Sequence, residues 1–278
     1  MRRDNKTISI LGCGWLGVPL GKHFIRKGWS VKGSVTSTDN FGLLSHAGIL
    51  PFRILVSDTE VIMDDPDFFH ADVLIISIPP ARTDDVEQVY PSQMRRLIPF
   101  IQYAGIQNVI FISSTSVYPE QNQVARENDP LTPGKASGKA LKEAENVLRE
   151  QSEFKTTIIR FGGLIGINRN PARFLLKSSQ PIQDAPVNLI HQDDCIGIIS
   201  EIISKEIWGE TLNACCPEHP MKKDFYGKAA MQTGYALPLM AEQKATYKIV
   251  DSSKLIHLLN YKFIYPNPMD YLDAVSQP

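Results

Sequence analysis

The run from Thr7 to Gly17 constrains the fold of this chain most strongly. It reads TISILGCGWLG, a short apolar stretch that ends in the pattern G-x-G-x-x-G, and an amphipathic segment follows at once. A strand that leads through such a turn into a helix presents free backbone N–H groups and the positive end of the helix to a dinucleotide pyrophosphate. The pattern alone is weak, but its place between a strand and a helix favours nucleotide binding over three chance glycines.

Each glycine of this turn has its own expected role. Gly12 supplies the tight turn, Gly14 allows the backbone to approach phosphate closely, and Gly17 lets the helix pack tightly on its strand. Trp15 and Leu16, which lie between them, complete the expected cofactor-binding turn.

Apolar runs and amphipathic segments alternate through the first 165 residues. Several runs are nearly continuous Ile, Val and Phe, as in parallel strands that helices cover on both faces. The expected strands are Thr7–Leu11, Ser30–Val35, Pro51–Leu55, Val73–Ile78, Val109–Ile112 and Thr157–Phe161. Helices are expected around Leu20, over Tyr90–Tyr103 and around Ala144. This alternation predicts an α/β fold with a Rossmann-type doubly wound parallel sheet.

After Gly166 the regular alternation of apolar runs and amphipathic segments ends, and prolines interrupt the sequence. Helices are expected around Ile199, over Phe225–Thr233 and over Ser252–Leu259. We therefore predict an NAD(P)-binding Rossmann domain over 1–165 and a small substrate-side lobe over 166–278. Part of the lobe, about 186–215, is expected to complete the Rossmann unit. The rest of this small C-terminal lobe is expected over the carboxyl edge of the sheet, where ligands of α/β proteins bind.

A second landmark is the segment VIFISSTSVY at 109–118, followed by PLTP at 130–133 and SGKALKEAE at 137–145. Further along come RFGGLIG at 160–166, NLIHQDD at 188–194 and GETLN at 209–213. In this order the segments resemble the extended short-chain dehydrogenase/reductase family, the NAD(P)-dependent epimerases and dehydratases. The resemblance implies a nicotinamide cofactor and a small polar or sugar-like substrate.

One position departs from the family's pattern. Ser114 aligns with the family's catalytic Ser/Thr and Lys139 with its Lys, but Lys135 stands where the catalytic Tyr of Tyr-x-x-x-Lys belongs. In the family that Tyr relays a hydroxyl proton while hydride moves, and the Lys lowers the Tyr pKa and holds the ribose. Three alternatives follow: Tyr118 reaches into the site, Lys135 acts as the acid/base with a pKa lowered by Lys139, or the protein binds the cofactor without this chemistry. A structural aromatic (Tyr118) and a solvated lysine (Lys135) are the simpler interpretations.

The end of the second expected strand bears on the choice of cofactor. Thr36 and Ser37 occupy its tip, where NAD-binding proteins place an acidic residue for the ribose 2′-OH. Their hydroxyls tolerate a 2′-phosphate that a carboxylate would repel, so NADP is expected in preference to NAD, although no Arg stands there. Asp58 is either the family's adenine-contacting acid or an ordinary turn residue. Ile78 and Pro79 complete the expected cofactor site.

Two arginines are candidates for binding an anionic substrate. Arg160 and Arg169 belong to the RFGGLIG segment and the loop after it, at the expected carboxyl end of the sheet. A guanidinium there can grip a carboxylate or phosphate, and an ion pair within the protein is the alternative. His191 is expected to be packed and hydrogen-bonded rather than catalytic.

Composition limits the partners. A net charge of −1 over 278 residues gives no basic footprint for nucleic acid or for a membrane surface, and no apolar run is long enough to span a bilayer. The four cysteines have neither disulfide nor zinc spacing, so no metal is expected. The opening MRRD leads directly into the first strand, and a cytoplasmic location is therefore expected. A small-molecule substrate is the expected partner, and a homodimer stays open.

Two functions fit these features. The first is an NAD(P)-dependent enzyme of the epimerase, dehydratase or reductase type, and the second is a non-catalytic NAD(P)-binding sensor or scaffold protein. The glycine turn and Lys139 support both, whereas the missing Tyr favours the second.

Overall fold

The computed structural model describes residues 6–169, 171, 181–236, 239–243 and 245–274. They belong to two compact units that are each discontinuous in sequence: unit 1 comprises 1–117, 132–159 and 202–211, and unit 2 comprises 118–131, 160–201 and 212–278. The opening residues Met1–Asp4, on which the expected location depends, lie outside the described part. The expected domain division at residue 165 stays a prediction.

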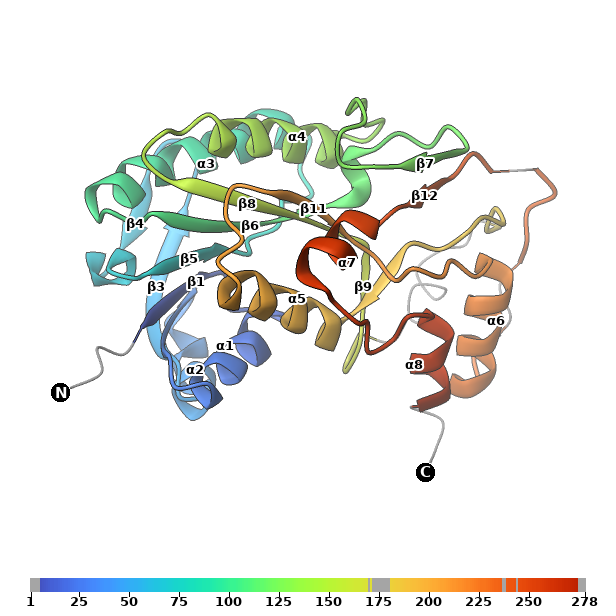
Figure 1. Ribbon diagram of the computed structural model, residues 1–278, viewed down its shortest axis with the longest axis horizontal. Coiled ribbons are helices and arrows are strands. Elements are labelled where there is room, and N and C mark those ends of the chain that lie inside the picture. Colours follow the sequence, from blue (N-terminus) through green and yellow to red (C-terminus); the bar gives the residue numbers. More distant parts are fainter. Residues whose placement is uncertain (1–5, 170, 172–180, 237–238, 244, 275–278) are drawn as a thin grey trace. The chain divides into compact units, whose positions relative to one another are not determined.

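The central sheet has eight strands in the order β11-β8-β6-β5-β1-β2-β3-β4 (Figure 1). β1 pairs in parallel with both β2 and β5, and the antiparallel β4 pairs with β3. The strand order therefore reverses beside β1, which is the topology of the predicted doubly wound fold. The strands are β1 (Thr7–Leu11), β2 (Ser30–Val35), β3 (Leu50–Val56), β4 (Val61–Met63), β5 (Val73–Ile76), β6 (Asn108–Ser114), β8 (Lys155–Phe161) and β11 (Thr211–Ala214).

Helices cover both faces of the sheet in unit 1. Figure 1 shows α1 and α2 on one face and α3 and α4 on the other. Their apolar residues recur at helical spacing: α1 buries Leu20 and Phe24, and α4 buries Leu141, Ala144 and Leu148. The α-helices are α1 (Gly17–Arg26), α2 (Phe41–His46), α3 (Val86–Tyr103) and α4 (Ala136–Arg149), and the 3-10 helices are η1 (Thr38–Asn40), η2 (Pro66–Phe69) and η3 (Thr115–Val117).

The expected elements agree with the structure to within a few residues. β1 and β2 have the predicted bounds, whereas β5 ends at Ile76 instead of Ile78 and α3 begins at Val86 instead of Tyr90. The short α2 and the antiparallel β4 were not predicted.

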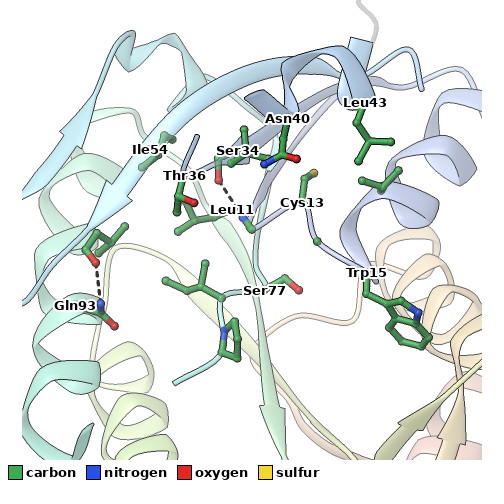
Figure 2. A pocket seen from close by; sticks show the side chains of 17 residues that line it. Leu11, Cys13, Trp15, Ser34, Thr36, Asn40, Leu43, Ile54, Ser77 and Gln93 are labelled. Atoms are coloured by element: carbon green, nitrogen blue, oxygen red, sulfur yellow. Dashed lines mark hydrogen bonds between the residues drawn. The ribbon is translucent and has the colours of Figure 1, made fainter. Parts of the chain in front are cut away.

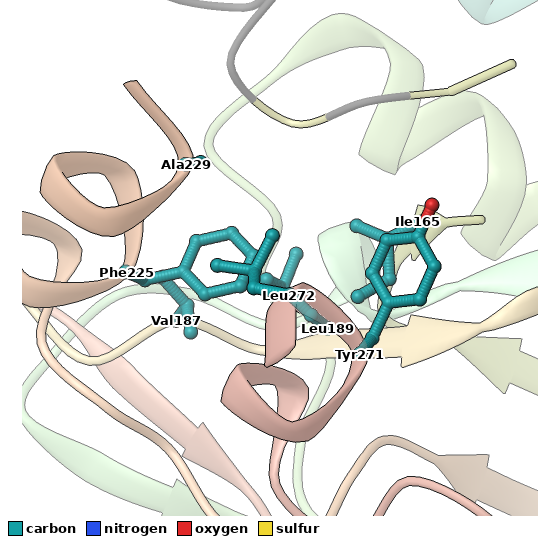
Figure 3. Packing of buried hydrophobic residues seen from close by; sticks show 7 residues of the cluster. All are labelled: Ile165, Val187, Leu189, Phe225, Ala229, Tyr271 and Leu272. Carbon is teal, nitrogen blue, oxygen red and sulfur yellow. The ribbon is translucent and has the colours of Figure 1, made fainter. Parts of the chain in front are cut away.

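Unit 2 is built from short strands and helices. β9 (Gly163–Ile165) pairs in parallel with β10 (Leu189–His191), and β7 (Gln123–Ala125) pairs in parallel with β12 (Lys248–Val250). The helices are α5 (Gln192–Ser204), whose last three residues belong to unit 1, α6 (Lys222–Thr233), α7 (Ser253–Leu259) and α8 (Pro268–Ala274). A buried apolar cluster joins α6 and α8 to β9 and β10 (Figure 3), and its members are Ile165, Val187, Leu189, Phe225, Ala229, Tyr271 and Leu272. None of the described helices is long and apolar enough to cross a membrane.

Candidate functional site

The three glycines after β1 stand in three different environments. Gly12 has φ +97°, which a residue with a Cβ rarely adopts, and an added Cβ would lie 2.9 Å from the Ser77 carbonyl oxygen. A Cβ at Gly17 would lie 2.8 Å from the Gly12 carbonyl oxygen. A Cβ at Gly14 would meet nothing within 4 Å. Gly12 and Gly17 therefore shape the turn, and Gly14 leaves open space above it.

Ser34 on β2 holds the turn in place. Its Oγ accepts from the Gly12 N–H at 2.9 Å, and its carbonyl oxygen accepts from the Cys13 N–H at 2.8 Å. α1 starts at Gly17 with no side-chain cap and no acidic residue in its first turn. The N–H groups of Val18 and Leu20 donate to the carbonyl oxygens of Gly14 and Leu16, and Pro19 has no N–H. What this end of α1 offers an anion is therefore mainly the positive end of the helix dipole.

A pocket of about 750 Å³ opens at the carboxyl ends of β1, β2, β3 and β5, beside the point where the strand order reverses (Figure 2). Its volume lies in the usual range for small-molecule sites. Six of the residues expected to bind a cofactor line it, namely Gly12, Gly14, Trp15, Thr36, Ile78 and Pro79. The other lining residues are Leu11, Cys13, Val18, Ser34, Val35, Asn40, Leu43, Ile54, Val56, Ser77 and Gln93. No lining residue is charged.

Five of the expected cofactor residues do not line the pocket, and one of them, Lys139, is described below with the catalytic residues. Leu16 and Gly17 are buried in unit 1. The Ser37 Oγ caps η1, where it accepts from the Asp39 N–H at 3.3 Å and donates to the Asp39 carboxylate at 2.8 Å. Asp58 lies in an exposed turn after β3.

Several lining residues were not identified from the sequence. Asn40 and Leu43 come from η1 and α2, which periodicity could not detect in so short a segment. Gln93 comes from α3, and its Nε2 donates to the Val56 carbonyl oxygen at 2.7 Å. Cys13 also lines the pocket, but burial raises its pKa to about 12 and keeps it a thiol.

Three of the expected catalytic residues lie in unit 1, outside the pocket lining. Ser114 ends β6, and its Oγ accepts from the Ser116 N–H at 3.2 Å. The exposed Lys135 immediately precedes α4, and its carbonyl oxygen accepts from the Lys139 N–H at 3.1 Å, one turn along the helix. The Lys139 Nζ lies 3.2 Å from Oε1 of Glu87 on α3.

The side chains of Tyr118 and Arg160 are hydrogen-bonded to each other inside unit 2. The Tyr118 hydroxyl donates to Asn213 Oδ1 at 2.8 Å and accepts from Arg160 Nη1 at 2.6 Å. Burial raises the pKa of Tyr118 to about 12. Nη1 of Arg160 also donates to the Glu127 carbonyl oxygen at 3.2 Å. Tyr118 and Arg160 are each 2% exposed. This arrangement favours the structural interpretation of both residues, whereas Arg169 is exposed in a turn.

His191 is buried in unit 2 between two tyrosine rings. Its ring centroid lies 4.3 Å from that of Tyr265 and 4.5 Å from that of Tyr271. Nδ1 accepts from the Asp193 N–H at 3.2 Å, and Nε2 has no hydrogen-bond partner among the described residues. Burial lowers the pKa of His191, so the ring is packed in its neutral form.

Comparison with known proteins identifies a relative in sequence and solved structures with the same fold. No family model matches the chain. The chain is 32% identical over 269 residues to Protein YeeZ of Escherichia coli K12, which covers 95% of this chain and 98% of YeeZ. A functionally unknown conserved protein from Silicibacter pomeroyi has the same fold, with a TM-score of 0.79, 22% identity and 98% of each chain covered. So does a short-chain dehydrogenase/reductase superfamily protein from Agrobacterium tumefaciens with bound NAD, with a TM-score of 0.72, 17% identity, and 97% of this chain and 95% of that chain covered.

Proposed function

The chain belongs to the extended short-chain dehydrogenase/reductase family, as a homologue of Protein YeeZ, and we propose from this premise that it binds a nicotinamide dinucleotide in the pocket of unit 1. The observation that carries the proposal is the open space at Gly14, next to the uncapped start of α1. A pyrophosphate needs close approach to the backbone, which Gly14 allows, and the start of α1 adds the positive end of a helix.

The uncharged lining supports NADP as the preferred cofactor. Thr36 and Asn40 offer a hydroxyl and an amide to the adenosine ribose, and no carboxylate lines the pocket to repel a 2′-phosphate. The only acidic residue at the tip of β2, Asp39, accepts a hydrogen bond from Ser37. The bound 2′-phosphate would gain charge-assisted hydrogen bonds from neutral donors.

We further propose that the protein is a reductase, epimerase or dehydratase that acts on a small polar or sugar-like substrate. The nicotinamide ring supplies hydride transfer when it is bound. Lys139 would bind the nicotinamide ribose through its ammonium group, and Ser114 would orient the reacting oxygen by a hydrogen bond. Arg169, exposed in its turn, remains the candidate for an anionic substrate group.

Neither candidate for the proton relay, Lys135 or Tyr118, stands in an environment that favours this role. Lys135 is exposed at the start of α4, and the Tyr118 hydroxyl is already bonded to two buried side chains. These observations favour a second candidate function, a non-catalytic NAD(P)-binding sensor or scaffold protein.

A crystal structure with NADPH soaked in tests the proposal. We expect density for the pyrophosphate against Gly14 and the start of α1. Side chains that can transfer a proton close to nicotinamide C4 would support the enzyme, and their lack would support the sensor. Binding elsewhere, or no binding, would overturn the proposed site.

A further inference from the structure

One side of the pocket has the composition of a base-binding site. Ile54 and Val56 from β3 supply apolar surface, and Gln93 from α3 supplies a side-chain amide. Figure 2 shows Gln93 on the opposite side of the pocket from Trp15, which belongs to the glycine turn. If phosphate occupies the glycine turn, the Gln93 side of the pocket receives a base at one end of the dinucleotide. The faces of a planar base suit its apolar walls.

The orientation of the Gln93 amide is fixed by its partner. The Val56 carbonyl oxygen, 2.7 Å from Nε2, can only accept a hydrogen bond. The NH₂ group must therefore face Val56, and the carbonyl Oε1 remains to accept from elsewhere. No hydrogen bond to Oε1 is found among the described residues. The pocket thus contains an amide held by one end with its acceptor end unused.

Asp58 does not supply this acceptor. It follows β3 in an exposed turn and does not line the pocket. Its backbone carbonyl oxygen accepts from the Nε of Arg96 at 3.0 Å, which ties the turn to α3.

We propose that Gln93 determines the base specificity of the bound dinucleotide, with Oε1 accepting a hydrogen bond from the exocyclic 6-amino group of adenine. This inference rests on the proposed cofactor site. Hypoxanthine carries a carbonyl oxygen at the same ring position, so two acceptors would face each other and both would lack a donor. An unmade hydrogen bond in a partly desolvated site reduces affinity by about tenfold.

The test compares adenine cofactors with their hypoxanthine counterparts. NADH and NADPH are titrated into the wild-type protein beside reduced nicotinamide hypoxanthine dinucleotide and its 2′-phosphate, with tryptophan fluorescence as the signal. We expect the adenine form to bind about tenfold more tightly. In Gln93→Met, which keeps the length of the side chain but has no acceptor or donor, the ratio should fall to about one. Gln88→Met, the same change at an exposed position of α3, is the matched control and should keep the tenfold ratio.

The outcomes distinguish a failure of the role of Gln93 from a failure of the proposed cofactor site. Equal binding of both bases by the wild type, or an adenine preference that survives Gln93→Met in a variant with unchanged circular dichroism, overturns the role of Gln93 and leaves the cofactor site standing. Failure of the wild type to bind any of the four dinucleotides overturns the proposed function and the inference with it.

Discussion

The ammonium group of Lys139 lies 3.2 Å from the carboxylate of Glu87 and joins the first turns of α4 and α3. Both side chains are about half exposed, 51% for Lys139 and 42% for Glu87. A pair this exposed contributes little, about 0.2–1 kcal/mol. In the proposed complex the ammonium group would exchange the carboxylate for ribose hydroxyls, so Glu87 would compete with the cofactor for it.

This competition predicts opposite effects of two substitutions. Glu87→Gln should tighten NADPH binding by about two- to fivefold, which corresponds to the free energy of an exposed pair. Lys139→Met should weaken binding, and Glu143→Gln, an exposed change on the same helix, should leave it unchanged. Fluorescence titrations measure all three. Wild-type affinity in Lys139→Met would remove Lys139 from the cofactor site.

The pocket wall at the tip of β2, which carries no carboxylate, predicts that NADPH binds more tightly than NADH. One charge-assisted hydrogen bond to the 2′-phosphate contributes about 1.5–3 kcal/mol, a preference of about tenfold or more. Thr36→Asp should reverse the preference, because a carboxylate repels the phosphate and accepts from the ribose 2′-OH. Parallel titrations of both cofactors decide the matter: equal affinities, or tighter NADH, in the wild type would contradict the assignment.

Lys135 at the position of the catalytic Tyr predicts weak or undetectable turnover on generic alcohols, ketones and nucleotide-sugars. Positioned acid–base catalysis contributes about 10²–10⁴-fold, and its loss should slow hydride transfer by a similar factor. Lys135→Tyr rebuilds Tyr-x-x-x-Lys in register with Lys139 and should raise turnover. Steady-state NADPH oxidation is the measurement. Robust wild-type turnover that survives both Tyr118→Phe and Lys135→Ala would mean that the proton comes from elsewhere.

The buried His191 predicts a loss of stability in acid. Burial holds its folded pKa below the ordinary 6.5, with Asp193 opposing the shift. Below pH 6.5 the unfolded chain therefore binds a proton that the folded chain does not, and the free energy of unfolding falls as pH falls. His23 and His219 are shifted in the same direction by burial and share the effect.

Urea unfolding between pH 7 and pH 5 checks this expectation. His191→Phe keeps a ring between Tyr265 and Tyr271 and should flatten the decline in stability. His257→Phe, at an exposed position of α7, is the matched control. An unchanged pH slope in His191→Phe would show that His191 does not contribute.

Much of the sheet could be predicted because its strands are short, apolar and bounded by turn residues. The run Thr7–Leu11 coincides with β1, since a mostly apolar run of this length, TISIL, forms a strand buried on both faces. The six-residue α2 and three-residue β4 escaped prediction because neither is long enough to show a period. The pairing of β9 with β10 joins segments more than 20 residues apart, and no local pattern encodes it.

Some residues of the candidate site could likewise be predicted from the sequence, and others could not. The glycine turn could be found because its backbone demands fix the residue type at Gly12 and Gly17. Gln93 could not, because one polar residue on an amphipathic helix looks like any exposed one until tertiary structure brings it next to Val56. The bonding of Tyr118 to Arg160 likewise depends on residues 42 positions apart.

The most direct test of the account is calorimetric titration of NADPH into the wild type and into Gly14→Val. A Cβ at Gly14 meets nothing within 4 Å, so the variant should fold with an unchanged melting temperature while its side chain fills the space for the pyrophosphate. Gly227→Val on α6, where an added Cβ also meets nothing within 4 Å, is the matched control and should bind as the wild type does. The account predicts binding by the wild type and no detectable binding by Gly14→Val. Unchanged affinity in Gly14→Val would contradict it.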